Sequence, residues 1–106
     1  MRERRDFSLA EVKQGLAEGS ILLVDVREPH EFATARIPGA VNLPLSVFDP
    51  SFIEPGPGQT VVFSCRSGVR SLTAIDASLA AGFPYAAHYP GAMLEWMREG
   101  EEVESG

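Results

Sequence analysis

The sequence has few of the residues that build disulfide frameworks or metal sites. Its 106 residues include a single cysteine, Cys65, so the chain cannot form an internal disulfide. With that cysteine and only two histidines, His30 and His88, it also lacks the ligand set of a zinc site. A lone thiol persists best in a reducing compartment. We therefore expect a cytoplasmic protein.

Long hydrophobic runs, an excess of positive charge and a phosphate-binding loop are also missing. The longest apolar run, residues 21–24, is far shorter than the ~20 residues of a membrane span. No apolar segment follows the basic start of the chain, so we expect no secretory signal. The net charge of −6 argues against a nucleic-acid partner, and no glycine-rich loop follows the first strand-like segment at 21–26. We expect no membrane or nucleic-acid partner, no cofactor and no metal.

What is present is the composition of an ordinary globular domain. Hydrophobic residues make up 44% of the chain and charged residues 23%, and 106 residues suit one domain. We expect a single domain over 1–106 with a core at about 7–100. Because glutamates crowd the last residues, we expect 101–106 to be an acidic, solvated and frayed tail.

Hydrophobic spacing and turn residues predict alternating helices and strands. Ser8 and Glu11 form a capping box that begins a helix over 8–18. The runs at 21–26 and 60–64 are apolar almost throughout, as in strands covered on both faces. The other expected elements are a short helix at 29–33, a strand at 41–43, a loop with a helical turn at 44–58, a helix from near 71 to 82, a strand at 86–89 and a final helix with Met93, Leu94, Trp96 and Met97 on its apolar side. This alternation predicts an α/β domain of three layers, α/β/α, around a central, mainly parallel sheet.

Cys65 follows the predicted strand 60–64, and ligands of parallel sheets bind beyond such strand ends. The next residues, Arg66-Ser67-Gly68-Val69-Arg70, can curl so that backbone N–H groups point inward, beside the positive end of the following helix. Both features should lower the pKa of the thiol, and the two arginines could bind an anionic donor such as thiosulfate. A lone cysteine at a strand end is more often a small buried hydrophobe, but two arginines and a glycine are poor core material. We therefore interpret Cys65 as a nucleophile and residues 66–70 as its substrate-binding cradle.

Three motifs in this order resemble the rhodanese family. Cys-Arg-Ser-Gly-Val-Arg-Ser at 65–71 is similar to the active-site loop of that family. Asp-Val-Arg-Glu at 25–28, Glu-Phe at 31–32 and Ile-Pro-Gly-Ala-Val-Asn-Leu-Pro at 37–44 resemble its upstream signature. Tyr-Pro-Gly-Ala-Met-Leu-Glu-Trp at 89–96 resembles its C-terminal segment. The resemblance spans about residues 7–100.

The resemblance implies a sulfurtransferase with a persulfide on Cys65. Sulfane sulfur would pass from a donor such as thiosulfate or a persulfide to cyanide or a thiol, and the acceptor could be a thioredoxin-like protein. Asp25 and Arg27 match positions that we expect to be structural, as a buried ion pair. The Gly-His usual in the upstream signature is replaced by Ala35-Arg36, which puts a positive charge where it could face the mouth of the pocket.

Two other classes of function stay open. One is a non-catalytic interaction or sulfur-relay module on the same scaffold. The other is a phosphatase or arsenate reductase, but tyrosine phosphatases carry arginine six positions after the cysteine, where this chain has Ser71. Related phosphatases of the rhodanese fold have a loop one residue longer than the six residues from Cys65 to Arg70. Neither histidine has supporting context: we expect His30 on the surface and His88 in an edge strand, both without a catalytic role.

Overall fold

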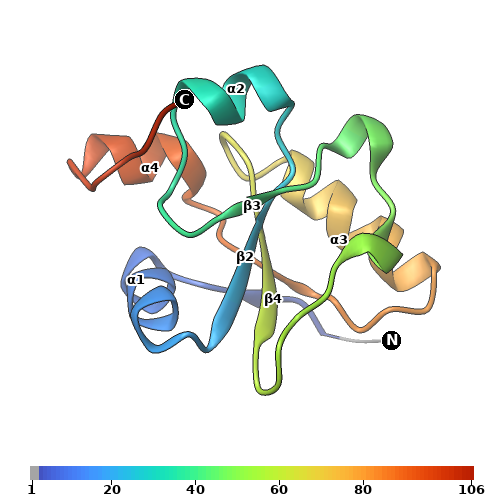
Figure 1. The fold of residues 1–106 in the computed structure, drawn as a ribbon. Helices are drawn as coiled ribbons and strands as arrows, with labels where there is room; N and C mark the ends of the chain where they lie inside the picture. The colour runs from blue at the N-terminus through green and yellow to red at the C-terminus, as the bar shows by residue number, and fades with distance from the viewer. Residues whose placement is uncertain (1–2) are drawn as a thin grey trace.

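A five-stranded sheet forms the centre of the computed structural model, which describes residues 3–106 (Figure 1). Its strand order is β1-β5-β4-β2-β3, and each of these pairings is parallel. The strands are β1 (Arg5–Asp6), β2 (Ile21–Asp25), β3 (Val41–Asn42), β4 (Thr60–Ser64) and β5 (Ala87–His88). The α-helices are α1 (Leu9–Glu18), α2 (Pro29–Thr34), α3 (Arg70–Ala80) and α4 (Ala92–Arg98), and two 3₁₀ turns occupy Leu45–Val47 and Pro50–Phe52.

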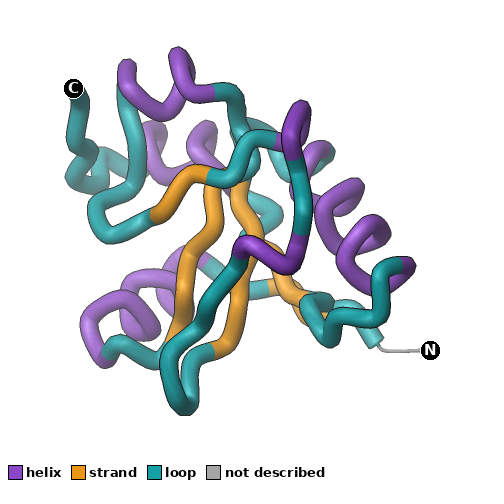
Figure 2. The backbone as a smooth tube through the Cα atoms, turned by 45° about the vertical axis from the view of Figure 1, so that its right-hand side comes forward, coloured by secondary structure: helices purple, strands orange, loops and turns teal. Residues whose placement is uncertain are grey.

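Helices cover both faces of the sheet, so the prediction of three α/β/α layers is confirmed (Figures 1 and 2). Successive residues of a strand point to opposite faces, and β4 shows the division directly. Val62 packs with α1 and α4, whereas Val61 and Phe63 pack with α3 and the 44–58 segment. With both faces buried, β2 and β4 need apolar residues at nearly every position. None of the helices in the described part of the chain is long and apolar enough to cross a membrane.

The helix and strand with the clearest sequence patterns lie where they are predicted. Helix α1 begins at the Ser8 cap with both hydrogen bonds of the capping box and ends at Gly19, whose φ of 71° is left-handed. Strand β4 covers the predicted residues 60–64. The segment 44–58 contains two 3₁₀ turns instead of one helical turn.

Two expectations about the end of the chain are wrong. The segment 101–106 is largely exposed, as expected, but it is not frayed. The indole N–H of Trp96 donates to the carbonyl oxygen of Glu102 at 2.7 Å, and Arg36 and Glu104 form an antiparallel bridge. In α4, Met93 and Trp96 are buried, but Leu94 and Met97 are 47% and 54% exposed. The helix has seven residues, and only its Met93–Trp96 side faces the sheet.

Candidate active site

Cys65 lies at the carboxyl end of β4, at the start of the loop that leads into α3. Strand β4 pairs with β2 on one side and β5 on the other, so the cysteine follows the middle strand of the sheet. Its side chain is 1% exposed and packs beside Phe63, Ala74 and Ile75. The buried site and the five-residue strand before it fix the position of the sulfur.

The sulfur lies within hydrogen-bond distance of a backbone N–H of the loop and of a hydroxyl at the start of α3. The N–H of Gly68 donates to Sγ at 3.1 Å, and the hydroxyl of Ser71 lies 3.7 Å from Sγ. Burial raises the pKa of the Cys65 thiol, but the backbone N–H and hydroxyl of Ser71, together with the N–H groups of Gly68 and Ser67, outweigh burial and lower it below its ordinary value. The loop therefore favours the thiolate, as a site for a sulfur nucleophile requires.

Helix α4 turns the loop N–H groups toward the sulfur. Its first-turn N–H groups have no partner within the helix, and those of Met93 and Leu94 donate to the carbonyl oxygens of Cys65 and Arg66, both at 3.1 Å. Because those carbonyls point to α4, the opposite edges of the peptides are free to face the site. Gly68 completes the turn with a φ of 92°, and a Cβ there would lie 2.6 Å from the carbonyl oxygen of Pro90. Only glycine fits this position without a shift of the backbone.

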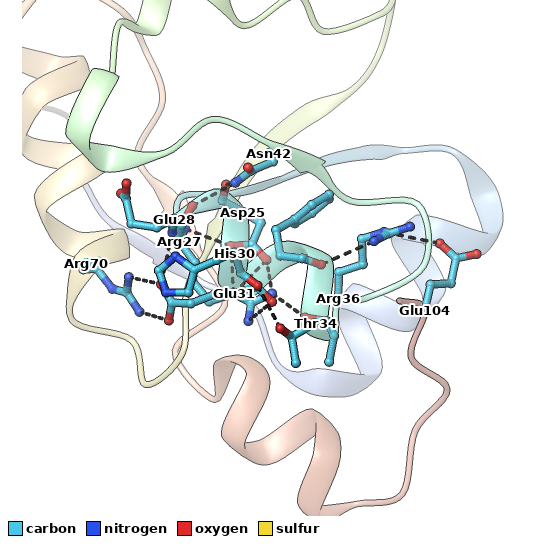
Figure 3. A network of polar contacts seen from close by, with 12 residues as sticks. Asp25, Arg27, Glu28, His30, Glu31, Thr34, Arg36, Asn42, Arg70 and Glu104 are labelled. Carbon is cyan, nitrogen blue, oxygen red and sulfur yellow. Dashed lines mark hydrogen bonds and ion pairs between the residues drawn. The ribbon is translucent and has the colours of Figure 1, made fainter. Parts of the chain in front are cut away.

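Arg70 closes the far end of the loop by binding α2. Its two terminal nitrogens contact the two carboxylate oxygens of Glu31 at 2.7 and 2.9 Å (Figure 3). This fork lowers the pKa of Glu31 from its ordinary 4.5 to about 2, and it raises the pKa of Arg70. The guanidinium predicted to bind substrate thus holds the loop to α2. Arg66, the other predicted arginine, is exposed, as are Ser67 and Val69.

Asp25 and Arg27 anchor α2 in turn. Their expected buried ion pair is present, with Arg27 Nη2 2.7 Å from Asp25 Oδ2 and both side chains nearly inaccessible. The same Nη2 donates to the carbonyl oxygen of Ala35 at 2.7 Å, just beyond the end of α2. Asn42 adds hydrogen bonds to the backbone oxygens of Asp25 and Arg27 (Figure 3). A continuous set of contacts therefore runs from the end of β2 through α2 to the active-site loop.

Arg36 does not face the active-site loop, contrary to the sequence-based expectation. Its guanidinium lies over the ring of Phe32, 5.0 Å from the ring centroid. It also donates to the carbonyl oxygen of Gly106 at 3.0 Å. The carboxylate of Glu104 lies 3.8 Å from the guanidinium (Figure 3). The charge at this position holds the C-terminal segment against α2.

The two histidines differ in their surroundings. His30 is exposed on α2, as expected. His88 is not in an edge strand, because β1 pairs with the outer side of β5. It is 2% exposed, and its Nδ1 lies 2.8 Å from the hydroxyl oxygen of Ser71. Ser71 and His88 are site residues that the sequence reasoning did not assign. The sequence reasoning did not predict β1, because its two residues, Arg5 and Asp6, are charged and exposed and show no strand pattern.

Comparison with known proteins decides the family. A model of the rhodanese-like domain matches residues 8–99. The chain belongs to the rhodanese family. The human thiosulfate:glutathione sulfurtransferase is 34% identical over 106 residues, a match that covers 87% of this chain and 92% of that protein. The human single-domain sulfurtransferase TSTD1 superposes with a TM-score of 0.75 at 32% identity, over 92% of this chain and 98% of that one.

A further relative has a longer chain than this rhodanese domain. An uncharacterized protein of Synechocystis sp. is 39% identical over 83 residues, which cover 78% of this chain but 46% of that protein. This chain thus spans about half the length of that relative. The named relatives support a rhodanese-type sulfurtransferase as the class of enzyme.

A groove with a mixed polar and apolar lining lies beside the rhodanese loop. It runs between α2 and α4 and is lined by Arg27, His30, Glu31, Thr34, Ala35, Arg66, Met93, Leu94 and Met97. The exposed Leu94 and Met97 thus belong to this groove. Residues 3–106 contain no cluster of histidine, cysteine and carboxylate side chains that could hold a metal ion.

The ion pair between Glu31 and Arg70 gives a testable pH dependence of stability. Because the pKa of Glu31 in the folded domain is about 2 and its ordinary value is 4.5, the stabilisation is complete above pH 4.5 and is lost as the pH falls toward 2. We expect Glu31→Gln to lower the free energy of unfolding by about 1–2 kcal/mol at pH 7, since the pair is partly exposed. By pH 3 more than half of this difference should be gone.

Urea unfolding of the wild type and Glu31→Gln at pH 7 and pH 3 measures this effect. The exposed Glu54 provides the control, and Glu54→Gln should change the free energy of unfolding by no more than about 0.5 kcal/mol at either pH. An equal loss for Glu31→Gln at both pH values would contradict the assignment.

Proposed function

We propose that the chain is a sulfurtransferase that carries sulfane sulfur as a persulfide on Cys65. The donor is thiosulfate or a related persulfide, and the acceptor is cyanide or a thiol. The observation that carries the proposal is the buried sulfur of Cys65 inside a loop whose N–H groups point at it. Such a site stabilises an anionic sulfur without a metal or a bound nucleotide.

The chemistry divides into two displacements at sulfur. The Cys65 thiolate attacks the outer sulfur of thiosulfate, a new S–S bond forms, and sulfite leaves with the electron pair of the broken S–S bond. The acceptor thiolate or cyanide then attacks the terminal sulfur of the persulfide, and the Cys65 thiolate leaves. The cradle of residues 66–70 is proposed to hold the anionic sulfur of Cys65 both as the thiolate and as the persulfide.

Size and charge of the loop support sulfur transfer over phosphate transfer. The loop from Cys65 to Arg70 has six residues, and Arg70 is bound to Glu31 instead of being free to grip a phosphate. The exposed Arg66 in the groove is the group that we propose attracts the anionic donor. For the acceptor we propose a small thiol, in line with the name of the human thiosulfate:glutathione sulfurtransferase.

A turnover assay tests the proposal. Sulfite release from thiosulfate, with cyanide or glutathione as acceptor, should fall at least ~10³-fold in Cys65→Ser, since the nucleophile is lost. Arg66→Ala should raise KM for thiosulfate several-fold and change kcat less. Arg98→Ala should change neither, because Arg98 pairs with Glu95 and Glu99 and does not line the groove. Undiminished turnover by Cys65→Ser, or hydrolysis of a small aryl phosphate at a comparable rate, would overturn it.

A further inference from the structure

A line of four side chains runs from the active-site sulfur to the surface. Sγ of Cys65 is 3.7 Å from Oγ of Ser71, and that oxygen is 2.8 Å from Nδ1 of His88. Nε2 of His88 lies 3.2 Å from Oδ1 of Asp6. The first three side chains are at least 97% buried, whereas Asp6 is half-exposed. The four residues come from the end of β4, α3, β5 and β1, so the fold brings them together.

The carboxylate at the outer end fixes the direction of every hydrogen bond in the line. An ionised carboxylate can only accept, so Nε2 of His88 carries the hydrogen and donates to Asp6. In neutral His88, Nδ1 then has the lone pair and accepts from the hydroxyl of Ser71. That leaves the oxygen of Ser71 to accept from the S–H of Cys65. Within this line of four side chains, every donor therefore points away from the sulfur and toward the surface.

We propose that Ser71 and His88, held by Asp6, form a proton relay that accepts the proton of Cys65. As Oγ of Ser71 takes the proton from Sγ, it passes its own proton to Nδ1 of His88. The products are a thiolate that accepts a hydrogen bond from Ser71 and an imidazolium paired with Asp6, so the net charge of the line is unchanged. Ser71 contacts the reacting sulfur, and His88 acts through Ser71 as a positioning residue.

The charged neighbours of His88 suit this role. Burial lowers the pKa of His88 most, Asp6 raises it, and Arg4, which is bonded to Asp6 at 3.0 Å, lowers it. Asp6 and Arg4 face His88 from β1 and the residue before it. From α3, His88 is contacted by the uncharged Ser71, which in turn contacts Cys65 at the end of β4. The net pKa is below the ordinary value, so His88 is neutral at rest. The negative charge of the Cys65 thiolate, once formed, then favours the proton on the imidazole. Use of the relay in sulfur transfer rests on the proposed function, but its existence does not.

The first test measures the thiolate in the absence of any sulfur donor. The rate of Cys65 alkylation by iodoacetamide is followed from pH 5 to 9 in the full chain. At pH 6 we expect His88→Asn and Ser71→Ala each to react about tenfold more slowly than the wild type, and the double variant no more slowly than either. At pH 9 all the rates should converge. The exposed His30 provides the control, and His30→Asn should follow the wild type throughout.

A profile of His88→Asn equal to that of the wild type would overturn the relay. So would a loss of the same factor at every pH, which is the result of a purely structural role.

The second test uses the wild-type sequence and does not depend on how the variants fold. Nitrogen-15 NMR of the imidazole should show that neutral His88 is the Nε2–H tautomer. Alkylation of Cys65 removes the thiolate partner, so it should lower the pKa of His88, because coupling between two sites is reciprocal. An unchanged His88 titration, or the Nδ1–H tautomer, would contradict the proposal. If this coupling holds but no persulfide forms, the relay stands and the proposed sulfurtransferase function fails.

Discussion

Gly68→Ala is expected to disable the active-site loop and destabilise the domain. The new methyl group would lie 2.6 Å from the carbonyl oxygen of Pro90, a backbone atom that cannot rotate away. It would also sit on a residue with a φ of 92°. The left-handed backbone costs about 1–2 kcal/mol and the collision about 1–3 kcal/mol more. Displacement of the Gly68 N–H from Sγ should also lower sulfur-transfer turnover on the order of 10²-fold.

Gly82 provides a matched control for this variant. Its φ of 88° is nearly the same as that of Gly68, but a Cβ there would have no atom within 4 Å. Gly82→Ala should therefore lower the free energy of unfolding only by about 1–2 kcal/mol, the cost of a left-handed backbone. Its turnover should equal that of the wild type. Denaturant unfolding and a steady-state assay of both variants separate the two effects. Equal stability and activity in the two variants would show that the approach of Pro90 does not matter.

Arg27→Met is expected to be the most destabilising single change at the site end of the sheet. It leaves the carboxylate of Asp25 buried with no counter-charge, and it removes the hydrogen bond to the carbonyl of Ala35. Breaking such a pair costs about 3–5 kcal/mol. The double variant Asp25→Leu/Arg27→Met removes both charges, so it should lose less than Arg27→Met alone.

A surface arginine shows what ordinary ion pairs contribute. Arg98 pairs with Glu95 and Glu99 with its own side chain 68% exposed, and Arg98→Met should cost no more than about 1 kcal/mol. Chemical denaturation of five proteins completes the comparison: the wild type, Asp25→Leu, Arg27→Met, the double variant and Arg98→Met. If the double variant loses the sum of the two single losses at Asp25 and Arg27, the two charges do not depend on each other.

The sequence predicts the centre of the fold and the active-site loop because both follow local rules. The strand 60–64 is apolar on both faces, and the two arginines and Gly68 that follow Cys65 predict a loop at its end. The cap at Ser8 is a local hydrogen-bond pattern, and the buried pair of Asp25 and Arg27 joins residues two positions apart. Each of these features is decided within a few residues of chain.

The features that the sequence does not reveal are contacts between distant segments. Strand β1 has two exposed charged residues and exists because its backbone pairs with β5. That pairing moves His88 from the edge of the sheet to a buried position beside Ser71. The acidic tail is held by Trp96 and Arg36, which composition alone cannot show. Likewise, Arg70 meets Glu31 across 39 positions of sequence.

The central claim is that Cys65 takes up one sulfane sulfur, and intact-mass spectrometry tests it most directly. The wild type and Cys65→Ser are incubated separately with thiosulfate and with a polysulfide, desalted and weighed. The account predicts a gain of the mass of one sulfur atom in the wild type, removed by cyanide or dithiothreitol, and no gain in Cys65→Ser. An adduct of the same mass on Cys65→Ser, or none on the wild type with either donor, would contradict it.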